Sequence, residues 1–227
     1  MRKIVVEATP GAVAPVRIAL LPGAYQEPDD FLREGFAQAV LRRGLDIDLE
    51  FVAPDLAHVM DRAVLQALHE HVVVPARAAG CRSLWLGGVS LGGFFALAYA
   101  ERRPRAVDGL CLFAPYLGNR MVTGEVAEAG GVRHWRPALI AEDDEERRIW
   151  ALIQRLESQP HLAVHLGIGR QDRFGHGHAL LADALPATAV DVIDGAHDWD
   201  AWRRLWDLFL DRFADPQALR PGAARLC

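Results

Sequence analysis

Short, almost continuous apolar runs recur along the chain, and longer stretches of mixed apolar and polar positions separate them. An apolar run that ends at glycine, proline or aspartate predicts a strand covered on both faces. The predicted strands are Val16–Leu21, Ile47–Val52, Ser83–Ser90, Val107–Phe113, Leu162–Ile168 and Ala189–Ile193.

The stretches between these strands repeat apolar side chains every three or four residues, which predicts helices with one buried face. The predicted helices are Asp29–Leu41, Val59–Ala78, Phe94–Ala100, Glu142–Leu156, His178–Ala184 and Asp198–Phe213. Pro75 is expected to disturb the second helix, because proline lacks the N–H that a helix interior needs.

Regular alternation of strands and helices predicts an α/β fold with a doubly wound, mostly parallel sheet and helices on both faces. A leading strand at Lys3–Ala8 is expected to form an antiparallel edge. The 227 residues predict a single domain over 1–227. Residues 117–137 lack periodicity and are interpreted as a short substrate-side loop, and residues 216–227 as a loosely held tail.

Composition and charge exclude several classes of function. The chain carries a net charge of −5, with 24% charged residues and dispersed arginines, so neither nucleic acid nor a membrane surface is an expected partner. No apolar run reaches the roughly 18 residues of a membrane span. The three cysteines are far apart and odd in number, which predicts no disulfides and a cytoplasmic location. Pairing into a homodimer stays open, because no interface is selected.

The most informative motif is Gly88-Val89-Ser90-Leu91-Gly92, which lies between a predicted strand and a predicted helix. A serine in this context is typical of a nucleophile elbow, a tight turn that exposes the hydroxyl above the sheet. Such a turn strains the serine backbone and leaves no room for neighbouring side chains, which explains the flanking glycines. Ser90 is therefore the candidate nucleophile.

A serine nucleophile needs a base and a group that orients the base. His197 lies between the last predicted strand and the last helix, and Asp172 follows the strand that begins near Leu162. The chain order serine, acid, histidine fits this arrangement. Asp143 and Asp144 are interpreted as helix-start residues instead. Asp194 is too close to His197 in sequence for an easy approach to its ring.

Backbone N–H groups of Leu91 and of Ala24 or Tyr25 are the candidate oxyanion hole, because Gly23 lets the loop approach closely. The candidate substrate-binding residues are Tyr25, Phe94, Trp135 and Phe174. Arg120 and Arg133 are candidates for an anionic substrate, although loop arginines are more often simply solvated. His176 and His178 lack a nearby third ligand, so no metal is predicted.

The blocks around Ser90, Gly169-Arg170-Gln171-Asp172 and Gly195-Ala196-His197-Asp198-Trp199 resemble the catalytic blocks of the α/β-hydrolase superfamily. Within that superfamily the chain resembles the small, lidless esterases and thioesterases, including the esterase-D-like group. This resemblance implies Ser90 as nucleophile, His197 as base and Asp172 as acid. The chain departs from the pattern at Pro22-Gly23, where a His-Gly pair is often seen.

The sequence therefore predicts a cofactor-free serine hydrolase that cleaves a small-molecule ester or thioester through an acyl-serine intermediate. The absence of a visible cap predicts short acyl groups. An acyltransferase that uses the same three residues is one alternative. A non-catalytic binding protein on the same fold is the other.

Overall fold

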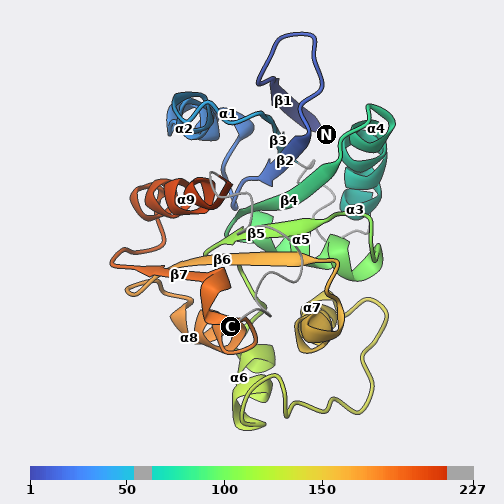
Figure 1. The fold of residues 1–227 in the computed structure, drawn as a ribbon. Coiled ribbons are helices and arrows are strands. Elements are labelled where there is room, and N and C mark those ends of the chain that lie inside the picture. Colours follow the sequence, from blue (N-terminus) through green and yellow to red (C-terminus); the bar gives the residue numbers. More distant parts are fainter. Residues whose placement is uncertain (54–62, 214–227) are drawn as a thin grey trace.

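The computed structural model describes residues 1–53 and 63–213. Its centre is a seven-stranded sheet in the order β1-β3-β2-β4-β5-β6-β7 (Figure 1). Only β1 is antiparallel to its neighbour, and the other pairings are parallel. The predicted sheet and its antiparallel edge are confirmed. The strands are β1 (Arg2–Val6), β2 (Val16–Leu21), β3 (Ile47–Ala53), β4 (Ser83–Val89), β5 (Gly109–Phe113), β6 (Ala163–Gly169) and β7 (Val190–Ile193).

Helices cover both faces of this sheet (Figure 1). On one face, α1 (Pro28–Arg33), α2 (Phe36–Arg42) and α9 (Trp199–Phe213) bury a core rich in aromatic rings. The second core lies on the opposite face, under α3 (Ala63–Leu68), α4 (Val74–Ala78), α5 (Leu91–Arg102), α6 (Arg120–Glu128), α7 (Glu145–Arg155) and α8 (Gly175–Ala182). Short 3-10 turns, η3 (Leu156–Ser158) and η4 (Ala187–Ala189), complete the connections.

The predicted helix Asp29–Leu41 is two helices, α1 and α2. Gly35 separates them with a φ of +80°, a left-handed conformation that glycine adopts without a steric penalty. The break turns α2 so that Phe36 packs edge-on against Phe31, with ring centroids 5.0 Å apart. The periodicity of the apolar side chains continues across the break, which explains why the sequence pattern predicts a single helix.

The predicted helix Val59–Ala78 is disturbed as expected, although its residues 59–62 lie outside the described part of the chain. A π-helical turn, η2 (His69–Val73), connects α3 to α4, and Pro75 stands in the first turn of α4. Pro75 has no N–H for the carbonyl of His71, four residues earlier. That carbonyl accepts a hydrogen bond from Lys3 Nζ at 2.9 Å instead.

The sequence predicts a loop over 117–137, and the structure corrects this by placing α6 within the segment. The Asn119 side chain caps the helix by accepting the N–H groups of Met121 and Val122. Gly124 lies in the middle of this short helix, and an internal glycine weakens the sequence signal for a helix without breaking this one. The predicted tail at 216–227 lies outside the described residues.

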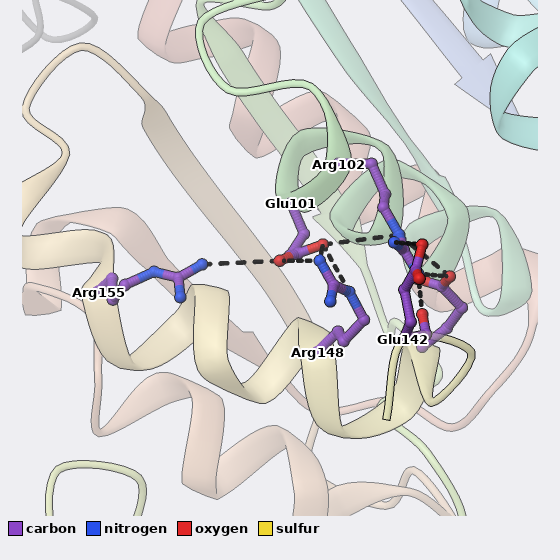
Figure 2. A network of polar contacts seen from close by, with 6 residues as sticks. Glu101, Arg102, Glu142, Arg148 and Arg155 are labelled. Atoms are coloured by element: carbon purple, nitrogen blue, oxygen red, sulfur yellow. Dashed lines mark hydrogen bonds and ion pairs between the residues drawn. The ribbon is translucent and has the colours of Figure 1, made fainter. Parts of the chain in front are cut away.

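A network of charged side chains connects α7 to α5 (Figure 2). Glu101 is almost buried and accepts hydrogen bonds from the Arg148 guanidinium at 2.8 and 3.0 Å, with Arg155 at 3.8 Å. Arg102 binds Glu145 and the backbone carbonyl of Glu142. Because α5 begins directly after Ser90, the network also fixes α7 relative to that serine.

His165 is a buried titratable residue of β6, 3% exposed, between the rings of Phe113 and Phe209. Burial lowers its pKa to about 3, and the nearby Asp191 only partly opposes this. At pH 5 the unfolded chain binds a proton that the folded chain does not. We therefore expect His165 to lower the free energy of unfolding by about 2 kcal/mol between pH 7 and pH 5.

Urea unfolding of His165→Gln at the two pH values tests this expectation. The variant lacks the titrating group, so its pH-dependent loss of stability is expected to be about 2 kcal/mol smaller than that of the wild type. The exposed His134 provides the matched control His134→Gln. An unchanged pH dependence in His165→Gln contradicts the expectation.

Candidate functional site

Ser90 occupies a strained turn between β4 and α5. Its φ of +51° and ψ of −116° are conformations that a non-glycine residue adopts only when the surroundings enforce them. Backbone hydrogen bonds hold Ser90 in this conformation. Its N–H donates to the Phe113 carbonyl at 3.0 Å, and its carbonyl accepts the N–H groups of Gly93 and Tyr116 at 3.1 and 2.9 Å.

The two glycines that flank Ser90 lie against the end of β2. A Cβ atom on Gly88 would come 2.1 Å from the Leu21 carbonyl oxygen, and one on Gly92 would come 2.0 Å from the same atom. Backbone contacts as short as these cannot be relieved by side-chain rotation. The glycines therefore allow α5 to start directly against the sheet, which sets the position of the Ser90 hydroxyl.

His197 and Asp172 meet Ser90 at the carboxyl ends of the parallel strands. His197 Nε2 lies 2.9 Å from Ser90 Oγ, and His197 Nδ1 lies 2.7 Å from Asp172 Oδ2. The three side chains form one continuous chain of hydrogen bonds, although they come from three distant parts of the sequence. The structure brings together all three residues that the sequence selected for this role.

Asp172 is ionised in this arrangement. Burial alone would raise the pKa of its carboxyl group, but hydrogen bonds from His197 and from the Phe174 N–H outweigh burial and lower the pKa. A carboxylate only accepts hydrogen bonds, so His197 Nδ1 carries the proton. Its Nε2 is then free to accept the proton of the Ser90 hydroxyl.

The loops that carry Asp172 and His197 are tied together. Gln171 N–H donates to the Gly195 carbonyl at 3.0 Å, and Gly195 N–H donates to Gln171 Oε1 at 2.6 Å. The imidazole of His197 is held edge-on between the rings of Phe174 and Trp202, with centroids 5.0 and 5.1 Å away. These contacts leave the imidazole little freedom to turn away from Ser90.

The loop after β2 lies beside the serine, as expected for the second oxyanion donor. A Cβ atom on Gly23 would come 3.2 Å from Ser90 Cβ, and the Gly23 N–H is already bound to Gln26 Oε1 at 2.9 Å. The next N–H groups belong to Ala24 and Tyr25. Leu91 contributes the first N–H of α5, a position that has no partner within a helix.

A cavity of about 590 Å³ lies where α6 and α8 begin, and Ser90, Asp172 and His197 are not among the residues that line it. Tyr116 connects it to Ser90 through the backbone bond described above, and Phe174 connects it to His197 through their ring contact. The cavity is lined by Tyr116, Leu117, Gly118, Asn119, Arg120, Thr123, Gly124, Arg173, Phe174, His176 and Gly177.

The four residues expected to bind substrate lie in different places relative to the cavity. Phe174 lines the cavity, and Phe94 packs behind its wall with its ring 5.8 Å from that of Tyr116. Trp135 is 3% exposed within the core, so the expectation that it meets substrate is wrong. Tyr25 is 98% exposed, with a left-handed φ of +63°, and does not line the cavity.

Sequence reasoning missed the polar wall of the cavity. Tyr116 Oη donates to Glu146 Oε1 at 2.8 Å, and Asn119 Nδ2 donates to Glu146 Oε2 at 2.7 Å. Burial, together with the Glu146 carboxylate, raises the pKa of the Tyr116 phenol and keeps it neutral. Tyr116 follows the end of β5, and this position in a parallel sheet was the signal available in the sequence.

The two histidines near Asp172 do not form a metal site. His178 is fully buried on α8, where its Nε2 lies 3.0 Å from the Pro115 carbonyl and burial lowers its pKa. His176 is exposed at the cavity. Within residues 1–53 and 63–213, no three His, Cys, Asp or Glu side chains are grouped to hold a metal ion. No helix in these ranges is long and apolar enough to cross a membrane.

One protein-family model matches the chain. It is the model named Esterase, described as "Putative esterase", and it covers residues 52–207, which is more than half of the chain. A search of curated proteins finds no match.

Several solved structures share the fold. FphF, a fluorophosphonate-binding serine hydrolase of Staphylococcus aureus, aligns with a TM-score of 0.67 and 12% identity over 92% of this chain and 90% of its own. Est1E from Butyrivibrio proteoclasticus gives 0.62 and 10% over 94% of each chain. The S-formylglutathione hydrolase FrmB of S. aureus gives 0.60 and 12% over 88% and 82%. At these identities, the likeness shows the α/β-hydrolase fold.

Proposed function

The chain belongs to the Esterase family and is a hydrolase of ester bonds, and from this premise we propose that Ser90 is its nucleophile, with His197 as base and Asp172 as the residue that orients the base. The observation that carries the proposal is the continuous hydrogen-bonded chain from Ser90 Oγ through His197 to Asp172. A serine hydroxyl is a weak nucleophile near neutral pH, and this chain supplies what it lacks.

In the first half of the reaction, Ser90 Oγ attacks the ester carbonyl while its proton passes to His197 Nε2. The imidazolium that results is stabilised by the Asp172 carboxylate. His197 then returns the proton to the departing alcohol, and the acyl group stays on Ser90. In the second half, His197 takes a proton from water while the water oxygen attacks the acyl carbon. The bond between the acyl carbon and Ser90 Oγ then breaks, Oγ takes the proton back from His197, and the acid is released.

The negative oxygen that forms in both halves is held by backbone N–H groups. We place one donor at Leu91, on the first turn of α5, and the other in Ala24–Tyr25, next to Gly23. Support comes from the close approach of Gly23 to Ser90 and from the helix start at Leu91. Removing one such donor typically lowers kcat about 10²–10³-fold.

The size of the cavity supports small acyl groups as substrates. A cavity of about 590 Å³ suits a small-molecule ligand. Thioesters fit the same chemistry, because the attacked carbonyl is the same and a thiolate leaves readily. We therefore propose short esters and thioesters as the substrate class.

Labelling with a fluorophosphonate probe tests whether Ser90 is an activated nucleophile. Wild-type protein is expected to be labelled and to hydrolyse p-nitrophenyl acetate, and Ser90→Ala is expected to do neither. Ser83→Ala is the matched control, because Ser83 lies at the start of β4, at the opposite end of the strand from Ser90. A folded wild-type protein that resists the probe would favour a binding protein on this fold and would overturn the proposal.

A further inference from the structure

The cavity beside Ser90 has an unusual balance of polar groups. Three of its polar side chains, those of Tyr116, Asn119 and Thr123, are already engaged by the protein itself. Tyr116 and Asn119 bind Glu146, the Asn119 side-chain oxygen accepts two N–H groups of α6, and Thr123 Oγ1 donates to the Asn119 carbonyl at 3.1 Å. These groups form part of the cavity wall, but they have few free hydrogen-bond donors or acceptors left for a ligand.

The polar side chains left over are basic. Among the described residues, Arg120 and Arg173 line the cavity and neither has an ion-pair partner, whereas many arginines elsewhere in the chain are paired. Arg173 packs over the ring of Phe174, with its guanidinium carbon 4.9 Å from the ring centroid. His176 is also at the cavity, and no aspartate or glutamate is among the residues that line it.

Two carboxylates lie behind the cavity wall, and the oxygens of both already accept hydrogen bonds from the protein. Glu146 accepts the Tyr116 hydroxyl, the Asn119 side chain and the Asn119 N–H. Asp172 is bound to His197 and to the Phe174 N–H. Among the residues that line the cavity, Arg120 and Arg173 are therefore the permanently charged ones, and neither is paired with either carboxylate.

Resting on the proposed function, we propose that this cavity binds a carboxylate on the substrate, so that the preferred substrates are esters with a short acyl chain that ends in a carboxylate. Arg120 and Arg173 reach the cavity from two different segments, one at the start of α6 and the other just before α8. Guanidinium groups pair with carboxylates through parallel hydrogen bonds, which suits this role. The rings of Tyr116 and Phe174, 5.9 Å apart, contact the apolar part of the chain.

From the sequence, Arg120 and Arg133 are both candidates to bind an anionic substrate, and the structure supports this role for only one of them. Arg133 is bound to Glu157 at 2.6 Å and is not among the cavity residues, so it carries no such role. Arg120 keeps the role, and its companion is Arg173, which the sequence did not single out.

Two aryl esters with the same acyl length test the inference. The mono-p-nitrophenyl ester of glutaric acid carries a terminal carboxylate, and p-nitrophenyl pentanoate is its neutral counterpart. For the wild type we expect kcat/KM to be about tenfold higher for the glutarate ester, as a charge-assisted hydrogen-bonded pair would give. Arg120→Gln and Arg173→Gln are each expected to lower this ratio about tenfold. Added salt is expected to lower it in the wild type.

Arg42→Gln is the matched control, because Arg42 is an exposed arginine on α2, on the other face of the sheet, without an ion pair among the described residues. This control is expected to keep the wild-type ratio. A wild type that cleaves the pentanoate at least as well as the glutarate ester overturns the inference and leaves the proposed function standing. If neither Arg120→Gln nor Arg173→Gln changes the ratio of kcat/KM for the two esters, the inference is overturned as well.

A binding measurement keeps the inference separate from catalysis. Calorimetric titration of Ser90→Ala with glutarate is expected to show millimolar binding that weakens about tenfold when Arg120→Gln or Arg173→Gln is added. This result is independent of whether Ser90 reacts. Absence of glutarate binding to folded Ser90→Ala overturns the inference, and absence of both turnover and probe labelling in the wild type overturns the proposed function.

Discussion

Asp172→Asn is expected to lower kcat about 10⁴-fold for any ester that the wild type cleaves, while the protein stays folded. The reason lies in how the Asp172 side chain is held. One of its oxygens accepts the Phe174 N–H at 2.8 Å, and the other accepts the proton on His197 Nδ1. In the variant, the Phe174 N–H selects the oxygen of the new amide, so the amide NH₂ faces His197.

That NH₂ group donates a hydrogen bond to His197 Nδ1 and leaves the imidazole proton on Nε2. An Nε2 that already carries a proton cannot take one from the Ser90 hydroxyl, so the nucleophile is not activated. Steady-state kinetics with p-nitrophenyl acetate measures the effect, and a thermal unfolding curve verifies the fold.

Asp194→Asn is the matched control for this prediction. Asp194 lies three residues before His197, but its side chain is 81% exposed and pairs only with Arg170, at 3.3 Å, among the described residues. Its kcat is expected to remain within about twofold of the wild type. A kcat for Asp172→Asn close to that of the wild type, or an equal loss in Asp194→Asn, would contradict the assigned role of Asp172.

Gly92→Ala is expected to destabilise the protein by about 3 kcal/mol and to abolish hydrolysis. The new methyl group would lie 2.0 Å from the Leu21 carbonyl oxygen and 2.6 Å from the Leu21 carbonyl carbon. Because both are backbone atoms, only a displacement of α5 relieves the overlap, and that displacement carries Ser90 away from His197. For a protein of this size, the loss corresponds to a fall in Tm of roughly 6–12 °C.

Gly124→Ala is the matched control, since a Cβ atom on Gly124 meets nothing within 4 Å. Gly124 lies inside α6, where alanine is favoured over glycine by roughly 0.5–1 kcal/mol, so this variant is expected to be slightly more stable than the wild type. Calorimetry on both variants measures the difference. A Tm for Gly92→Ala equal to that of the wild type would show that the contact with β2 is not tight.

The sheet could be predicted from the sequence because its strands are short apolar runs with clear ends. The run Val16–Leu21 matches β2 at both of its ends. Ser90, Asp172 and His197 could be selected because each lies at or beyond the end of a predicted strand, and the carboxyl ends of parallel strands meet at one edge. Their mutual distances depend on packing around Phe174 and Trp202, which no local pattern reveals.

The features that the sequence missed depend on contacts between distant residues. From the sequence, Trp135 is expected to line the pocket, but it is buried in a core whose members come from many parts of the chain. Arg173 stands out only when its cavity neighbours and its lack of an ion pair among the described residues are known. The break at Gly35 depends on a left-handed φ, whereas glycine also occurs inside α6 without a break.

The most direct measurement of the central claim is the location of the acyl group during turnover. A reaction with p-nitrophenyl acetate is quenched in acid, and the protein is digested and analysed by mass spectrometry. The account predicts one added acetyl group, on the peptide that contains Ser90, and no acetyl group at this serine in His197→Ala. Hydrolysis by the wild type with no acetylated Ser90, or with the acetyl group on another residue, would contradict the account.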